Sequence, residues 1–315
     1  MPEPWRIVFL GTPEFAVPSL AALAGSEDQV LLVITQPDRP QGRGRRPSPP
    51  PVKVLAQKLD LPVWQPESIK TPAAFNRLKE LTPDLLVVVA FGAILPLNLL
   101  QLPRIGPLNV HPSLLPAYRG PAPINWAILN GETETGVTTM FLDQGMDTGP
   151  ILLSRRTAIG PLETAGQLHD RLARLGAELL LETIAGLKAG RVTPKPQPST
   201  GATGATLAPL LKKADGLIDW TRPAEELARR VRGLDPWPGA YTTFKGKILK
   251  LFGARPGPGR GRPGQVLALD QGLLHVAAGQ GSLALAELQL EGKRRLRAPE
   301  FWRGQRLGST DFFGD

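Results

Sequence analysis

The sequence predicts an α/β protein with a Rossmann-like, mostly parallel sheet, followed by a small C-terminal β-barrel of the oligonucleotide-binding (OB) type. Two observations support this fold class. In the first half of the 315-residue chain, continuous apolar runs alternate with helix-like segments, as in parallel sheets covered on both faces. Short strands separated by Gly-rich turns fill the last third, and about five such strands fit an OB barrel.

The predicted parallel sheet occupies the first half of the chain. Its apolar runs have the length of buried strands and are bounded by turn residues or by helical spacing. The predicted strands cover residues 7–10, 30–35, 85–90, 136–142 and 151–157. A helix is expected after the first strand, from about Phe15, and Pro18 is tolerated near its start.

A long helix is expected from about Thr164, since leucines recur on one face until Gly190. The next stretch is rich in Pro, Thr, Gly and Ala and indicates a linker. A short helix then resumes at about Pro223. The barrel strands are predicted at residues 241–244, 248–252, 265–269, 273–277 and 283–290. We therefore expect three segments: a catalytic domain (1–190), a linker (191–209) and an OB-like domain (210–315).

Composition limits the function classes. Without cysteine the chain has no disulfide scaffold, thiolate metal site or cysteine nucleophile, and three histidines make a multi-histidine zinc site a poor expectation. The chain has neither a roughly 18-residue apolar run nor a secretory signal, so a cytoplasmic protein is expected. A formal net charge of +9 attracts polyanions such as nucleic acid, although it also serves solubility alone.

Asn109 and His111 form the main chemical signal. Residues two apart on a strand point to the same side, so these two should project together with Val110 opposite. Pro112 ends the strand, which places the pair where open parallel sheets build their sites. An amide can donate to an oxyanion, and an imidazole can donate or relay a proton. A histidine that only makes a hydrogen bond at a strand end is the competing interpretation.

Residues 136–151 form the second signal, a strand, a Gly-rich loop and another strand. Gly145 and Gly149 let the backbone bend and approach a ligand, and both Asp143 and Asp147 are candidates for chemistry. The competing interpretation is a solvated turn in which Asp caps backbone amides.

Several arginines are candidates for anion contact. Residues 36–46 combine four arginines with glycines in an exposed, mobile loop suited to phosphate contact, or a solvated surface. Arg119, in a Pro-rich loop, is free either to bind an anion or to stay solvated. The first strand ends at Gly11 without the Gly-x-Gly-x-x-Gly spacing, so dinucleotide binding is poorly supported.

These segments together resemble the methionyl-tRNA formyltransferase family, a branch of the folate-dependent formyltransferases. The resemblance covers most of the chain as an ordered series of motifs. They are FLGTPEFAVPSL, TQPDRPQGRGRR, VVVAFGAILP, NVHPSLLPAYRGPAPINWAILNG, GVTTMFLDQGMDTGPIL, KADGLIDW and VRGLDPWPGAYT. The fourth and fifth are specific to folate-dependent formyltransferases, and the arginine loop and C-terminal half point to the tRNA branch.

The resemblance implies 10-formyltetrahydrofolate as formyl donor and the methionine amino group of initiator tRNA as acceptor, with no metal and no obligate protein partner. It implies a formyltransferase fold in the first domain and a tRNA surface on the C-terminal barrel. The family's catalytic residues map onto Asn109, His111 and Asp147. Its folate pocket maps onto Phe91, Gly92, Ile94, Leu95, Leu142, Asp143 and Gly145. The residues expected to contact the formyl-folate or the acceptor end are Ser113, Leu114, Leu115 and Pro116. The residues expected to contact the tRNA are Arg39, Arg43, Arg45 and Arg46.

Three alternatives stay open. A formyltransferase for a small amine, or a formyl-folate hydrolase, would need neither the arginine loop nor the barrel. A non-catalytic RNA-binding protein would explain the charge but would leave Asn109, His111 and Asp147 without a purpose. A nicotinamide dehydrogenase is disfavoured by the Gly11-Thr12-Pro13 turn.

Overall fold

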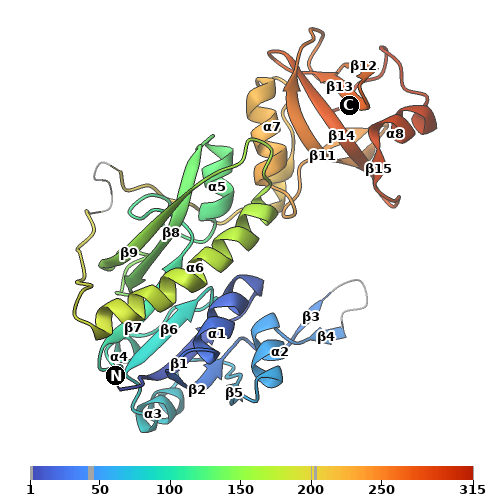
Figure 1. Cartoon of the computed structure of the whole chain (residues 1–315). Helices are drawn as coiled ribbons and strands as arrows, with labels where there is room; N and C mark the ends of the chain where they lie inside the picture. The colour runs from blue at the N-terminus through green and yellow to red at the C-terminus, as the bar shows by residue number, and fades with distance from the viewer. Residues whose placement is uncertain (1–2, 42–45, 200, 202–203, 315) are drawn as a thin grey trace. The chain divides into compact units, whose positions relative to one another are not determined.

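The computed structural model of the chain describes residues 3–41, 46–199, 201 and 204–314. Two compact units are present (Figure 1). The first comprises residues 1–120, 136–157 and 169–207, and the second comprises residues 121–135, 158–168 and 208–315. Each unit is described by itself.

A seven-stranded sheet forms the centre of the first unit, in the order β5-β2-β1-β6-β7-β8-β9. The first five strands of this order are parallel, whereas β8 runs antiparallel to β7. The predicted mostly parallel sheet is therefore confirmed. The strands are β1 (Arg6–Gly11), β2 (Gln29–Ile34), β5 (Val63–Trp64), β6 (Leu85–Val89), β7 (Gly106–His111), β8 (Glu134–Phe141) and β9 (Ile151–Ala158).

The strand order reverses between β1 and β6, because the chain runs outward from β1 to β5 and then returns to β6. Ligands of open α/β sheets bind at the carboxyl ends of strands beside such a switch point. Here the two strand ends are tied together, since Thr12 Oγ1 donates to the Phe91 carbonyl at 2.9 Å. This edge of the sheet is where a site is expected.

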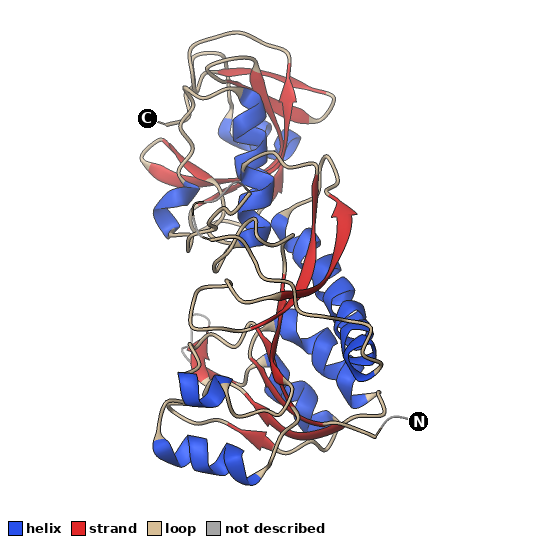
Figure 2. Ribbon diagram, turned by 90° about the vertical axis from the view of Figure 1, so that its left-hand side faces the viewer, coloured by secondary structure: helices blue, strands red, loops and turns tan. Residues whose placement is uncertain are grey.

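Helices cover both faces of this sheet (Figure 2). Alternate residues of β1 and β6, such as Val8 and Leu86, pack with Leu78 of α3 and Leu99 of α4. On the other face α6 lies so close at Gly176 that an added methyl group would overlap Val110 of β7. The helices of this unit are η1 (Glu14–Ala16), α1 (Val17–Ala24), α2 (Pro51–Lys58), α3 (Pro72–Glu80), α4 (Leu97–Leu100) and most of α6 (Ala165–Lys188).

The sequence pattern predicts a plain loop for the arginine segment 36–46, and the structure differs. The described part of this segment forms a small antiparallel hairpin of β3 (Arg39–Gln41) and β4 (Arg46–Ser48). The sequence pattern did not reveal these two strands, because three residues are too few to show the alternation typical of a strand. Residues 42–45 lie outside the described part of the chain.

The second unit is built on an antiparallel sheet in the order β10-β11-β14-β13-β12, with β15 paired to β14. Phe244, Phe301, Phe313 and Trp220 pack in its core with tilted or edge-to-face rings, whose centroids lie 5.3–6.2 Å apart. Its strands are β10 (Tyr241–Phe244), β11 (Lys247–Gly257), β12 (Val266–Asp270), β13 (Leu273–Ala277), β14 (Ser282–Leu290) and β15 (Leu296–Arg297). Its helices are α5 (Pro123–Leu129), η2 (Lys213–Gly216), α7 (Ala224–Gly233) and α8 (Ala298–Gln305).

All five strands predicted for the C-terminal part are present, as is the short helix that precedes them. The sequence pattern did not predict β15 or α8, because each is short. Closure of this sheet into an OB barrel stays a prediction.

The predicted linker, residues 191–209, makes ordered contacts with the first unit. Lys195 and Ile151 exchange backbone hydrogen bonds of 2.8 Å in both directions. Arg119 N–H donates to the Thr206 carbonyl at 2.9 Å. The domain limits at residues 190 and 210 stay a prediction. Among the described residues, no helix is long and apolar enough to cross a membrane.

Candidate active site

His111 is the last residue of β7 and Asn109 stands two positions before it. Val110 between them faces α6, so Asn109 and His111 share the opposite face of the sheet. Both side chains are buried, with 9% of Asn109 and 4% of His111 exposed. The sequence had predicted this arrangement at a carboxyl strand end, and the structure has it.

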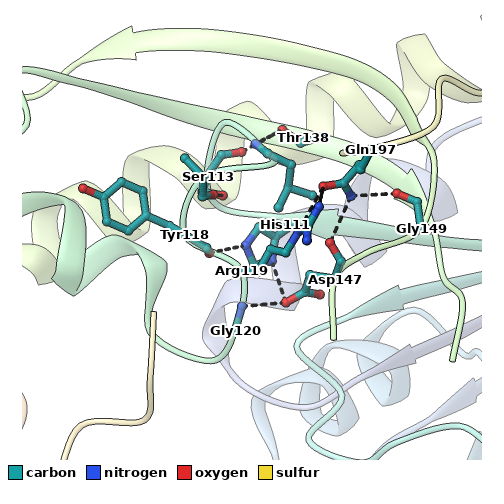
Figure 3. A network of polar contacts seen from close by, with 11 residues as sticks. His111, Ser113, Tyr118, Arg119, Gly120, Thr138, Asp147, Gly149 and Gln197 are labelled. Atoms are coloured by element: carbon teal, nitrogen blue, oxygen red, sulfur yellow. Dashed lines mark hydrogen bonds and ion pairs between the residues drawn. The ribbon is translucent and has the colours of Figure 1, made fainter. Parts of the chain in front are cut away.

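The imidazole of His111 lies between two loops (Figure 3). Its Nε2 is 2.9 Å from the carbonyl oxygen of Tyr118. Because a carbonyl only accepts, Nε2 carries a proton and donates it to this bond. Nδ1 faces the Asp147 carboxylate, 3.6 Å from Oδ2. The nitrogen that can gain or lose a proton is therefore the one beside Asp147.

Asp147 lies in the loop between β8 and β9, with a left-handed backbone at φ 53°. Its Oδ2 accepts a 2.8 Å hydrogen bond from the Gly120 N–H. Its carbonyl accepts another from Gln197 Nε2 at 2.9 Å. The structure thus brings Asp147 to His111, a pairing that the sequence predicted from two motifs 36 positions apart in the numbering.

Asn109 differs from its neighbours in one respect. Within the described part of the chain, its carboxamide has no recorded hydrogen-bond partner, although 91% of the residue surface is covered. A buried amide without a partner is costly unless water or a ligand satisfies it. Asn109 therefore has donor capacity available beside the His111–Asp147 pair.

Asp143 serves the loop itself. Its Oδ1 accepts from the Gly145 N–H at 2.9 Å and from Thr148 Oγ1 at 2.7 Å. A methyl group added at Gly145 would overlap Thr148 Oγ1. The capping turn that the sequence analysis raised as a competing interpretation thus describes Asp143, whereas Asp147 faces His111.

The segment after β6 offers apolar surface at the same edge of the sheet. Phe91 and Leu95 are buried in a cluster against which Leu142 packs, so the two predicted parts of the folate pocket do meet. Ile94 is 77% exposed. Gly92 has a φ of 82° and open space on its side-chain side. Such a surface can pack against the face of a flat ring, and the assignment of these residues to a folate pocket stays a prediction.

Hydrogen bonds of buried side chains stabilise the turn that follows His111. Ser113 is fully buried and its Oγ donates to the Ala117 carbonyl at 2.6 Å. Thr138 Oγ1 donates to the Ser113 carbonyl at 2.7 Å and accepts from the Leu115 N–H at 3.1 Å. Leu114 approaches Gly136, and Pro116 is half-buried. Ser113 and Leu115 thus shape the turn, and contact with a substrate stays a prediction for all four residues.

The arginine hairpin is anchored at its base. The Asp38 carboxylate accepts from Lys53 Nζ at 2.8 Å and from Gln65 Nε2 at 2.7 Å, and these bonds hold the pKa of Asp38 below its usual value. Arg39 is exposed on β3. Arg43 and Arg45 lie outside the described residues, and of Arg46 only the backbone in β4 is described.

Arg119 is neither solvated nor open to an anion, and the sequence-based expectation was wrong. Only 1% of it is exposed. Its Nη2 donates to Gln197 Oε1 at 2.8 Å and to the Pro198 carbonyl at 2.9 Å. Sequence reasoning missed Gln197 altogether, because a lone glutamine among prolines carries no recognisable pattern.

The described residues contain no cluster of three or more His, Asp or Glu side chains able to hold a metal. The site that they do form consists of an amide, an imidazole and a carboxylate beside an apolar surface. Such a set can stabilise an oxyanion and move a proton.

Comparison with known proteins agrees with this chemistry. Residues 5–184 match the family model described as formyl transferase, and residues 210–306 match the formyl transferase C-terminal domain. The chain is 55% identical over 308 residues to the methionyl-tRNA formyltransferase of Pelobacter propionicus, covering 98% of this chain and 96% of that one. It is 51% identical over 309 residues to the Myxococcus xanthus protein of the same name, covering 98% of both.

Solved structures share the fold. An N-formyltransferase from Helicobacter canadensis, in complex with folinic acid and dTDP-3-aminofucose, superposes with a TM-score of 0.65 at 17% identity, covering 92% of this chain and 99% of that one. HypX from Aquifex aeolicus with tetrahydrofolic acid gives 0.62 at 21% identity, covering 98% of this chain and 50% of that one. Both the fold and the resemblance noted in the sequence are thereby confirmed, and the chain belongs to the formyl transferase family.

Proposed function

We propose that this chain transfers the formyl group of 10-formyltetrahydrofolate to the α-amino group of methionine on initiator tRNA. The relatives' name, methionyl-tRNA formyltransferase, supports formyl transfer to methionyl-tRNA. The observation that carries the proposal is the His111–Asp147 pair beside the partner-free Asn109 amide. Relatives of that name are similar over 98% of the chain, which includes the second unit. We place the activity in the cytoplasm, where translation begins.

The proposed reaction begins with a neutral amine. A free α-amino group has a pKa of about 7.7–8.0, so a useful fraction is neutral near pH 7. The amine attacks the formyl carbon, and negative charge develops on the formyl oxygen of the tetrahedral intermediate. Asn109 donates its amide hydrogens to that oxygen, which is the usual role of an amide in an oxyanion site.

His111 and Asp147 handle the proton in this proposal. The Nε2–H bond to the Tyr118 carbonyl fixes the ring, so Nδ1 beside Asp147 is the position that can receive a proton. The proton leaves the attacking nitrogen and reaches the departing nitrogen of the folate, and Asp147 stabilises the charged imidazole meanwhile. His111 thus supports the oxyanion as a nearby positive charge.

The proposed substrate contacts follow the same edge of the sheet. The donor pocket uses Phe91, Gly92, Ile94, Leu95, Leu142, Asp143 and Gly145, and the turn 113–116 adjoins the formyl group or acceptor end. The tRNA contacts use Arg39, Arg43, Arg45 and Arg46, with a further surface on the segment 210–315. Residues 1–190 would supply catalysis, joined through residues 191–209.

The test is an incubation of the purified protein with 10-formyltetrahydrofolate and either methionyl initiator tRNA or a set of free amines. Deformylation of the folate is followed, together with formyl-methionine released from the tRNA. We expect turnover with the charged tRNA alone. Turnover with a small amine or with water, at rates equal to those with tRNA, would favour a small-amine formyltransferase or a hydrolase instead.

A further inference from the structure

Two residues that follow α6, Gln197 and Thr206, hold both loops on which the His111–Asp147 pair depends. One loop contains Tyr118 and Gly120, whose backbone groups bind His111 Nε2 and Asp147 Oδ2 respectively. The other contains Asp147 itself. In the segment that the sequence predicted as a linker, Gln197 binds both loops and Thr206 binds the loop of Tyr118.

Gln197 has a single chemically consistent orientation. Its Oε1 accepts from Arg119 Nε at 3.2 Å and Nη2 at 2.8 Å, and a guanidinium only donates. Its Nε2 donates to the carbonyls of Asp147 at 2.9 Å and Gly149 at 2.7 Å. The side chain therefore joins Arg119 of one loop to two backbone carbonyls of the other (Figure 3).

The backbone at both loops needs such support. Asp147 and Tyr118 have positive φ angles of 53° and 60°, which cost non-glycine residues about 1–3 kcal/mol and persist only where surroundings fix them. Gln197 binds the carbonyl of the first, and Thr206 Oγ1 accepts from the N–H of the second at 2.9 Å. A methyl group at Gly149 would overlap the Phe141 carbonyl, so this loop also has little freedom to rearrange.

Arg119 completes the connection. Its side chain is buried and bonded to Gln197 and to the Pro198 carbonyl, and its N–H donates to the Thr206 carbonyl. Its two neighbours in sequence supply the groups that hold His111 and Asp147. A shift of Gln197 is thus transmitted to both partners of the pair.

We propose that Gln197, through Arg119, is a positioning residue for the reaction: it sets the separation of His111 from Asp147. This inference rests on the proposed function, in which that pair moves the proton. A residue that acts in this way changes turnover and its pH dependence, and it leaves substrate binding alone.

The first test is Gln197→Glu. The new carboxylate keeps an oxygen toward Arg119 and adds a favourable charge there, but it places an acceptor against the carbonyls of Asp147 and Gly149. We expect kcat to fall roughly ten- to a hundredfold, as for a small misplacement of catalytic groups, with KM unchanged for folate and for charged tRNA.

The pH profile separates positioning from partial unfolding. A smaller folded fraction lowers kcat at every pH by the same factor, whereas a changed His111–Asp147 distance shifts the pH at which activity is half-maximal. The imidazole can also be titrated directly by NMR, because the chain has only three histidines and His169→Gln and His275→Gln assign the signals. We expect the His111 signal alone to titrate at a different pH in Gln197→Glu.

Gln265→Glu is the matched control. Gln265 also accepts from a backbone N–H, that of Arg262, and donates to a backbone carbonyl, that of Ser309, but within the second unit. We expect it to keep both kcat and the pH profile. Should Gln197→Glu fail to fold, Gln197→Met removes the two donors without adding charge, and the same loss of kcat and shift of profile are expected.

Asp147→Asn, measured in parallel, distinguishes the two ideas. If it keeps full turnover, the proposed catalytic site is wrong and the positioning role falls with it. If it loses turnover while the Gln197 variants keep the wild-type kcat and profile, the site stands and the positioning role is overturned.

Discussion

At the scale of single residues, the candidate site depends on which polar groups have partners. His111 has both ring nitrogens engaged, one by the Tyr118 carbonyl and one facing Asp147. Asn109 is as well buried but has no recorded partner among the described residues. The amide is therefore available to donate to a substrate oxygen.

We predict that Asn109→Ala lowers kcat by roughly 10²–10³, as the loss of one oxyanion donor does elsewhere, while the protein stays folded. Steady-state kinetics with charged initiator tRNA measures the loss, and circular dichroism checks the fold. Turnover near that of the wild type would remove Asn109 from the mechanism.

Asp235 is a second residue whose surroundings matter, because they predict how protein stability depends on pH. Burial raises its pKa, and the charge of Glu287 adds to this, while Arg295 opposes it. A carboxyl whose pKa is raised on folding binds its proton more tightly in the folded state. Its ionisation therefore reduces stability as pH rises above the unfolded value of 3.8.

Asp235→Asn should consequently raise the melting temperature at pH 7, by roughly 1–3 °C after allowance for its partial exposure. The gain should vanish near pH 3, where both states carry the proton. Thermal unfolding of the two proteins across this range tests the sign. A gain of equal size at both pH values would exclude ionisation as its cause.

At the scale of elements, the β3–β4 hairpin overlaps a segment with four arginines, residues 36–46. Asp38 fixes its base through Lys53 and Gln65, and the low pKa of Asp38 keeps this anchor charged at any physiological pH. The sequence has four arginines at residues 39–46, and Arg39, whose side chain the structure describes, is exposed. This arrangement suits phosphate contact, which positions a nucleic acid without reading its sequence.

We predict that Arg43→Ala raises the KM for charged tRNA and leaves folate affinity intact, because Arg43 belongs to the arginine-rich segment 36–46 of the sequence and to none of the proposed folate contacts. Fluorescence titration with a folate analogue and kinetics with varied tRNA measure the two separately. Loss of folate affinity with an unchanged KM for tRNA would contradict this division of roles.

At the scale of the whole molecule, the net charge of +9 favours a polyanionic substrate. Contacts between cationic side chains and phosphates release counterions. The logarithm of the binding constant therefore falls linearly with the logarithm of the salt concentration. We predict that tRNA affinity falls by roughly tenfold or more between 50 and 200 mM salt, whereas folate affinity changes little. A flat response of tRNA binding would argue against an electrostatic contribution.

The match between sequence and structure is best where the pattern is local. The runs at residues 85–90 and 283–290 became β6 and β14 because continuous apolar content in short segments specifies buried strands. The two-residue strand β15 and the helix α8, of little more than two turns, were missed because so few positions do not establish a strand or helix period. The His111–Asp147 pairing was predicted only through resemblance, because no periodicity joins residues from different strands.

By itself, the sequence determined most strands of both sheets, the placement of Asn109 and His111 on one face, and the family. These follow from side-chain alternation and from motifs read along the chain. Only the tertiary structure decided that Arg119 is buried and that Gln197 holds Asp147, 50 positions away. Such contacts depend on where loops meet at the sheet edge, and a Pro-rich segment without periodicity carries no sign of where it will lie.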